Sequence, residues 1–258
     1  MALSSISNLK ECVSDSERKQ RFGVVTINVI VWLFIGLMVV STAGFVLIFA
    51  VPGLILHWLL AEYNVRKVQA LGVTISKRQI PQLQQMADEV CARFGIERTP
   101  KIIVINSGES NAFSLRFARK KVIILLSDLL YGVSQNPSEV KFILGHEICH
   151  AVMDHGLRGV LEIYKPAKYK QARELTCDNA GLVAAGSLDG SLTALRKLCV
   201  GHRLHKWLDN SALIEEANQI YSGLTGWLVR QHLSHPPAGS RIENLARFYQ
   251  ENGQTAAG

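Results

Sequence analysis

A long apolar segment interrupts an otherwise mixed pattern of hydrophobic and polar residues. It runs from Phe22 to Ala61 without one Asp, Glu, Lys or Arg. About 20 apolar residues suffice for a helix that crosses a bilayer, so one helix of this length would be about twice as long as needed. The segment therefore predicts two transmembrane helices, at about 22–40 and 45–61, joined by a turn near Ser41–Gly44. Pro52 is expected to kink the second helix.

Basic residues flank this segment at both ends. They are Lys10, Arg18, Lys19 and Arg21 before it and Arg66, Lys67, Lys77 and Arg78 after it. Lys and Arg next to membrane spans favour the cytoplasmic side, and two crossings return the chain to the side where it began. The flanks thus predict an integral membrane protein with both ends in the cytoplasm; in a bacterium the membrane would be the inner membrane. The alternative is a soluble protein whose apolar hairpin is buried or docks against another subunit.

The rest of the chain contains both helical and strand patterns. Short runs rich in β-branched residues predict strands at 101–105 and 121–126. Apolar residues at helical spacing predict helices at 80–94, 136–153, 172–185, 192–208, 212–232 and 240–250. We therefore expect an α+β fold, mainly helical with a small sheet. Its parts would be a cytoplasmic lead (1–21), a transmembrane hairpin (22–61) and a larger domain (66–258).

Composition excludes several classes of protein. With 48% hydrophobic and 19% charged residues among 258, the chain is too apolar to be disordered. Its five cysteines show no Cys-x-x-Cys spacing, which argues against a zinc ribbon or a dense disulfide framework. The net charge of +7 comes partly from the basic flanks, and no nucleic-acid-binding motif accompanies it. We therefore predict no nucleic-acid partner, and contact with a lipid bilayer instead.

The sequence His146-Glu147-Ile148-Cys149-His150 has H-E-x-x-H spacing within the predicted helix 136–153. Residues four apart lie on one side of a helix, so both imidazoles can bind a single zinc ion. Glu147 lies beside them without being a ligand. From there it can take a proton from a water molecule that the metal activates and return it to the leaving amine.

A catalytic zinc ion needs three protein ligands and one open position. The extended metzincin spacing would put a third histidine at Gly156, so that subclass is excluded. Glu174 and Asp178 lie four residues apart on a later predicted helix. Glu174 would complete the ligand set, and Asp178 could hold a ligand histidine through its other ring nitrogen. Taken alone, the pair could equally be two exposed acids on a helix.

Four motifs together resemble the membrane-linked zinc metallopeptidases of family M48, which include the HtpX and Ste24 types. They are NAFS (111–114), HEICHAVMDH (146–155), ELTCDNAG (174–181) and SHPPAGSRIENL (234–245). The resemblance covers roughly residues 66–250. It implies a gluzincin-type fold with one zinc ion per chain on His146, His150 and Glu174, and Glu147 as the general base.

The resemblance also implies roles for residues outside the ligand set. Asn111, Ala112 and Phe113 would border the cleft, where a substrate can pair as an added β-strand. His235 matches the His-Pro motif of the family; it could donate a hydrogen bond to the oxyanion, or it could be a structural residue. Arg241 is expected to pair with a carboxylate near the site.

One departure from the family is the short connection between the two predicted metal-binding helices. HtpX-like members carry membrane spans there, whereas Glu174 follows His150 by only 24 residues in this chain. We therefore predict a compact variant: a membrane-anchored zinc endopeptidase acting on protein or peptide substrates, of unspecified oligomeric state. The alternative is a membrane adaptor or chaperone-like protein with a non-catalytic metal site.

Overall fold

A four-stranded sheet packs between helices in the part of the chain that the computed structural model describes, which comprises residues 3–42, 44–106, 112–117, 120–153, 163–233 and 235–253. The helices are α1 (Asp15–Ser41), α2 (Leu47–Leu71), α3 (Pro81–Arg93), α4 (Ser127–Val133), α5 (Pro137–Met153), α7 (Ala167–Ala185), α8 (Leu188–Leu204), α9 (Asn210–Ile220), α10 (Gly223–His232) and α11 (Ala238–Gly253). The strands are β1 (Gly72–Thr74), β2 (Lys101–Ile105), β3 (Ala112–Phe117) and β4 (Lys120–Leu126). The predicted class, mainly helical with a small sheet, is confirmed.

The strand order in the sheet is β1-β2-β4-β3, so β1 and β3 form its two edges. β2 and β4 run parallel, and the outer strands are antiparallel to their neighbours. Alternate side chains of a strand point to opposite faces. Ile102, Ile123 and Leu125 therefore face the main core with α3 and α5, while Ile103 and Ile124 face the other way.

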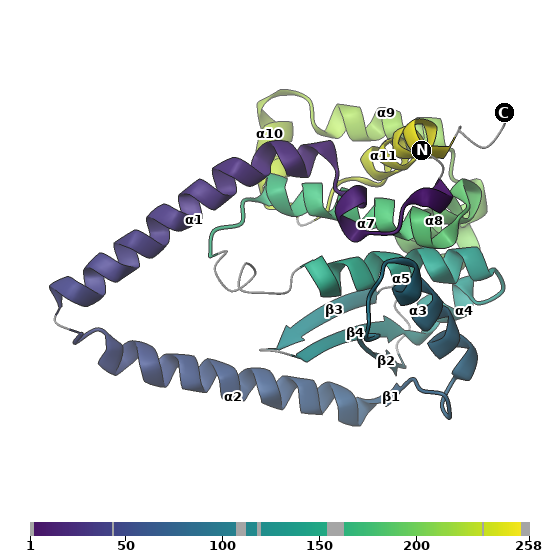
Figure 1. Cartoon of the computed structure of the whole chain (residues 1–258). Helices are drawn as coiled ribbons and strands as arrows, with labels where there is room; N and C mark the ends of the chain where they lie inside the picture. Colours follow the sequence, from purple (N-terminus) through teal and green to yellow (C-terminus); the bar gives the residue numbers. More distant parts are fainter. Residues whose placement is uncertain are drawn as a thin grey trace.

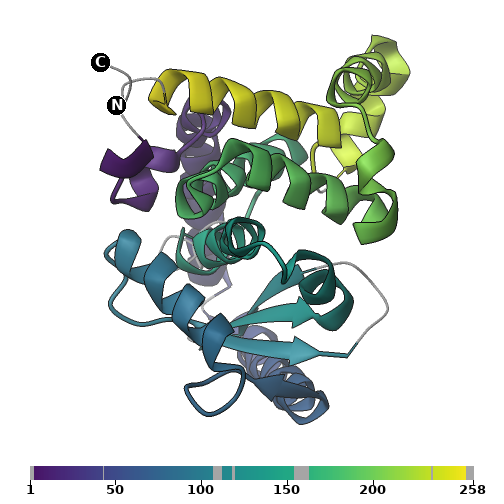
Figure 2. The same cartoon turned by 90° about the vertical axis from the view of Figure 1, so that its right-hand side faces the viewer.

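The helices are stacked in layers above the sheet. Figure 2 shows the yellow α11 at the top, the green α7 and α8 below it, then the teal α5, and finally the sheet. α5 therefore lies between the sheet on one side and α7 on the other. This middle position places its side chains within reach of both.

The end of α2 covers the second face of the sheet. Val65 is buried there against Ile103, Val122, Ile124 and Leu126. α2 continues from the uncharged segment through Val65 to Leu71 as one helix. The expected start of the domain at residue 66 thus falls inside a continuous helix.

The beginning of the chain packs into the main core. Leu3, Ile6, Leu9 and Cys12 are all members of that core. α1 starts at Asp15 rather than near residue 22, because Ser14 caps it by accepting a hydrogen bond from the backbone N–H of Glu17. The division into lead, hairpin and domain remains a prediction, although the lead does not lie apart from the core.

α1 and α2 are splayed apart and approach each other near the turn that joins them (Figure 1). Gly44 in this turn has φ +81°, a conformation that glycine adopts without strain. Both helices are long and apolar enough to cross a membrane, and most of their large apolar side chains are exposed. The predicted pair of apolar helices is confirmed.

The prediction of one helix over 212–232 was wrong. The structure has two helices there, α9 and α10, and Gly223 has φ +66° between them. That left-handed conformation breaks the helix, and periodicity alone does not reveal it. The short elements β1, β3 and α4 were also missed, because three to seven residues give too little pattern to detect.

α5 and α7 approach closely because each presents a glycine to the other. A Cβ atom on Gly145 would lie 2.6 Å from Cβ of Ala184, and one on Gly181 would lie 2.7 Å from the backbone oxygen of Phe142. No ordinary side chain fits at such distances. The contact brings the turn of α5 that begins at His146 directly against α7.

Replacing Gly181 with Ala should lower the free energy of unfolding by about 1–3 kcal/mol, the usual effect of overpacking. Helix propensity acts in the opposite direction, since Ala is favoured over Gly by about 1 kcal/mol inside a helix. Thermal unfolding of the purified protein in detergent checks this. Gly23→Ala is the control, because Gly23 is also helical but has no atom within 4 Å of an added Cβ. Equal stability of the two variants would contradict the tight contact.

Candidate metal centre

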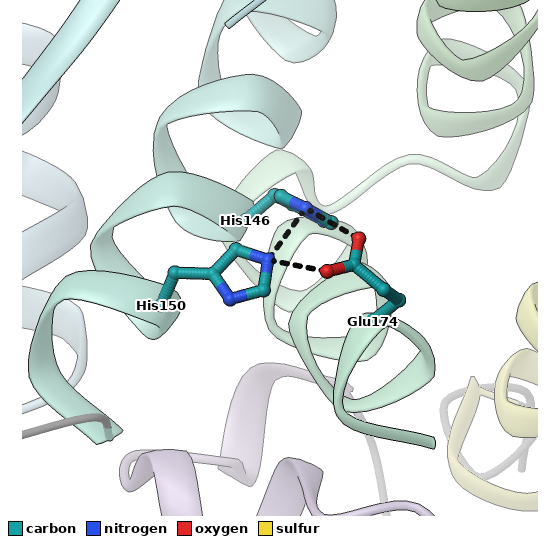
Figure 3. A group of neighbouring side chains, drawn as sticks. All are labelled: His146, His150 and Glu174. Atoms are coloured by element: carbon teal, nitrogen blue, oxygen red, sulfur yellow. Dashed lines mark hydrogen bonds and ion pairs between the residues drawn. The ribbon is translucent and has the colours of Figure 1, made fainter. Parts of the chain in front are cut away.

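Three side chains from α5 and α7 converge on one point (Figure 3). His146 and His150 come from successive turns of α5, and Glu174 comes from α7. Nε2 of His146 lies 3.1 Å from Nε2 of His150. Oε1 of Glu174 is 3.2 Å from His150 Nε2, and its Oε2 is 3.6 Å from His146 Nε2. The structure therefore brings together the three residues that were expected to bind zinc.

The spacing of these atoms fits one metal ion. Two nitrogens about 2.0–2.1 Å from a tetrahedral zinc ion would be about 3.3–3.4 Å apart, close to the separations observed. Two imidazoles and a carboxylate are also a donor set that zinc accepts. The candidate ligand atoms of the three side chains all lie within 4.8 Å of one another. The site can therefore hold a divalent metal without rearrangement of the helices.

Asp178 lies one turn beyond Glu174 on α7 and orients His146. Its Oδ1 is 2.9 Å from Nδ1 of His146, and its side chain is fully buried. An ionised carboxylate can only accept, so the proton of the imidazole belongs on Nδ1. When a metal ion binds, it displaces the proton on Nε2, and this atom then presents its lone pair toward Glu174 and His150, as a metal ligand requires.

Arg241 on α11 keeps Asp178 ionised. Its Nε donates to Oδ2 at 2.8 Å and its Nη2 to Oδ1 at 2.6 Å, a two-point pairing. Burial would raise the pKa of Asp178, but the Arg241 guanidinium and the hydrogen bond to His146 hold it below its usual range. Sequence reasoning expected an acidic partner for Arg241 near the site, and the structure supplies Asp178.

The charges of the site favour a cation between the histidines and Glu174. Burial lowers the pKa of His146, but its hydrogen bonds to Asp178 and Glu174 raise it to about 10 overall. Burial raises the pKa of Glu174, yet contacts with His146, His150 and His235 hold it far below its ordinary value. The carboxylates of Glu174 and Asp178 therefore stay negative, and a positive charge near them is stabilised.

Glu147 follows His146 on α5 and is 5% exposed. Among the residues that the structure describes, none forms a hydrogen bond with its buried Oε2. Burying a carboxylate oxygen without a partner is unfavourable, so native proteins rarely keep one without a reason. The atom is therefore available to a small polar group such as water.

His235 contacts a candidate metal ligand, whereas the predicted substrate-binding segment is described only in part. Nδ1 of His235 is 2.7 Å from Oε2 of Glu174, and the ring is 62% exposed, so this residue reaches the site. Ala112 and Phe113 belong to β3, the edge strand, which contacts α5. Asn111 lies outside the described residues.

Sequence reasoning missed a buried polar cluster that ties the start of α1 to α7. Ser14 donates from Oγ to the backbone oxygen of Ala172 at 2.8 Å. Thr176, two residues after Glu174, donates to Oε2 of Glu17 at 2.6 Å. The cluster anchors the first apolar helix on the helix that carries Glu174. Its members are separated by about 160 residues, and no local pattern marks them.

Asn28 was missed as well. Its Oδ1 accepts from the backbone N–H of Tyr164, and its Nδ2 donates to the oxygen of Tyr164, both at 2.9 Å. This double contact holds the chain just before α7 against α1. A signal was available, because Asn28 is the only carboxamide in the uncharged segment and a buried amide needs partners.

Two comparisons with known proteins bear on this site. Residues 77–165 match the model of Peptidase family M48. The protein named "Plastoglobule-localized metallopeptidase 48, chloroplastic" of Arabidopsis thaliana is 27% identical over 194 residues, which are 64% of this chain. The resemblance to peptidase family M48 is confirmed. The family match includes His146 and His150 but ends before Glu174, so the third ligand rests on the structure. The chain spans 56% of the length of this relative. No solved structure matches the chain.

Removing Arg241 should destabilise the protein strongly. Arg241→Ala would leave the buried Asp178 with one partner fewer, and losing one member of a buried pair costs roughly 3–5 kcal/mol. The expected result is a large fall in the thermal unfolding midpoint in detergent. Arg247→Ala is the matched control, since Arg247 is exposed on the same helix. A similar shift for both variants would show that Arg241 does not compensate a buried charge.

Proposed function

We propose that the chain is a membrane-anchored zinc endopeptidase that binds zinc through His146, His150 and Glu174. The observation that carries the proposal is the convergence of these three groups beside the unpartnered buried oxygen of Glu147. The M48 match supports a metallopeptidase. Protein or peptide substrates follow from that class of enzyme.

Glu147 would act as general base and then as general acid. Its Oε2 accepts a proton from the attacking water while the water oxygen forms a bond to the scissile carbonyl carbon. The carboxylic acid then returns that proton to the amine nitrogen as the C–N bond breaks. Zinc, when bound, supplies polarisation of the carbonyl and a lowered pKa of water.

The surrounding residues would hold the reacting groups in place. Asp178 fixes the protonation of His146, and Arg241 keeps Asp178 ionised. His235 lies against Glu174, beside the ligand set. We propose that His235 donates a hydrogen bond to the oxyanion that develops at the scissile carbonyl.

The substrate would bind as an extended strand along β3. β3 is an edge of the sheet and contacts α5, so a peptide added there would run close to the metal ligands. The edge of a sheet offers backbone donors and acceptors to an added strand of any sequence, which would be the fifth strand here. The predicted contact residues remain Ala112 and Phe113, at the start of this strand, and Asn111, which lies outside the described residues.

The bilayer would be crossed by α1 and α2. Their exposed apolar surfaces have the length and composition of membrane spans. Basic residues on both flanks favour a cytoplasmic catalytic domain. The name of the Arabidopsis relative places that protein in plastoglobules, which is a property of the relative.

Glu147→Gln should retain metal and lower the cleavage rate by about 100-fold or more, because the amide cannot accept the proton. Cleavage of a quenched fluorescent protein substrate and metal analysis of the purified full chain check both parts. His146→Ala and Glu174→Ala should lose metal. Glu243→Gln is the control, because Glu243 is exposed, and it should change neither the metal content nor the cleavage rate. Undiminished cleavage by Glu147→Gln contradicts the mechanism. Wild-type protein that binds metal but cleaves no substrate supports the adaptor alternative.

The full chain should stay in the membrane pellet after extraction with alkaline carbonate, because two apolar spans hold it in the lipid. Protease added to inverted membrane vesicles should digest the domain, and right-side-out vesicles should protect it. Release by carbonate would contradict the membrane spans. Digestion in right-side-out vesicles alone would reverse the proposed orientation.

A further inference from the structure

α10 presents an apolar face that no described residue covers. Leu224, Trp227 and Leu228 are 75%, 51% and 47% exposed, and their spacing places them on one side of the helix. The opposite side is packed, because Gly226 is buried against the backbone of Ile220. A surface helix of a globular protein normally turns its apolar side inward, so this face calls for a partner.

The orientation of α10 is fixed by hydrogen bonds. Gln171 on α7 donates from Nε2 to the backbone oxygens of Arg230 and Leu233, both at 2.9 Å. Arg230 lies in the last turn of α10 and Leu233 is its C-cap residue, and backbone oxygens at a helix end have no partner within the helix. The Arg230 guanidinium also lies 3.9 Å from the centre of the Tyr221 ring. The apolar face thus points outward from a helix that is anchored at its end.

α10 lies on the side of the domain from which the two apolar helices project (Figure 1). α1 and α10 both pack on α7. The uncharged segment of α1 begins at Phe22, about 10 Å beyond its start at Asp15. The boundary between headgroups and acyl chains would therefore lie near the level of α10.

Basic side chains occupy the same region. Lys168 and Lys170 are exposed at the start of α7, and the backbone oxygen of Lys168 accepts a weak hydrogen bond of 3.5 Å from Gln20 on α1. The start of α7 at Lys168 therefore lies beside α1, just before its uncharged segment. Anionic lipid headgroups would be within reach of these lysines. Apolar and basic groups at one level are the composition of a membrane interface.

We propose that α10 is an interfacial helix that lies in the surface of the same bilayer that α1 and α2 cross. Leu224, Trp227 and Leu228 enter the boundary between headgroups and acyl chains, the position that tryptophan prefers in membranes. The inference rests on the proposed membrane anchoring of α1 and α2. It has a consequence for the site, because α10 leads through Leu233 to His235, which contacts Glu174.

Quenching of tryptophan fluorescence by brominated lipids tests the inference in the full chain. The protein contains four tryptophans, and single-tryptophan variants are made by replacing the other three with Phe. Each variant is reconstituted into anionic vesicles whose lipids carry bromine either near the headgroup or near the chain end. Trp227 should lose emission mainly with bromine near the headgroup. Trp32, about 15 Å beyond Phe22 along α1, should lose emission mainly with bromine near the chain end.

Trp207 is the control for non-specific quenching. It is 79% exposed, and the 11-residue helix α9 separates it from α10. Trp207 should be quenched by neither lipid. In the Trp227 variant, the changes Leu224→Gln and Leu228→Gln should reduce the loss of emission, because they remove most of the apolar face.

Quenching of Trp32 without quenching of Trp227 would overturn the inference while leaving the membrane anchor intact. In that case the face of α10 belongs to a protein partner or a second copy of the chain. Absence of quenching at Trp32 would instead contradict the anchor, and the inference with it. Equal quenching of Trp207 and Trp227 would also overturn the interfacial position, since the contact would not be specific to α10.

Discussion

The close contact between α5 and α7 is the constraint on which the site depends. The ligand atoms of His146 and Glu174 can lie within a few ångströms of each other only if their helices nearly touch. Gly145 and Gly181 make this possible by leaving no Cβ at the point of contact. Each glycine lowers helix propensity by about 1 kcal/mol relative to Ala, so the packing of α5 against α7 has to offset that loss. The next residue after Gly145 is the first histidine of H-E-x-x-H, so packing and chemistry share one turn.

Charge extends this constraint to a third helix. Glu174 and Asp178 are both buried, and two buried carboxylates repel each other unless cations lie between or beside them. Arg241 on α11 neutralises Asp178 from one side, and His146 bridges the two acids. α11 is therefore part of the site although it contributes no ligand. A metal ion at the histidines would complete the same balance of charge.

Local features of the site could be predicted from the sequence, and contacts between distant segments could not. The spacing of His146 and His150 is set by the helix itself, and the strand at 101–105 is marked by its β-branched residues. The position of Glu174 relative to the histidines depends on how two helices pack, and helix geometry does not give it. Glu174 could therefore be predicted only from its motif. The hydrogen bonds of Asn28 to Tyr164 join residues 136 apart in the chain, and a single amide has no periodicity to reveal its partner. Gly223 likewise needed its backbone angle to be seen as a break.

The two apolar helices are attached to different elements of the domain. α1 is tied to α7, which carries Glu174, through Ser14, Glu17 and Thr176. α2 packs instead on the sheet, whose edge β3 is the proposed path of the substrate. A bilayer that holds α1 and α2 would therefore hold α7, which carries Glu174, and the edge strand β3 at a set separation. In the proposed arrangement, movement of α1 in the lipid would displace α7, and movement of α2 would displace the sheet. The membrane would therefore help to position the residues of the site and would not be only an anchor.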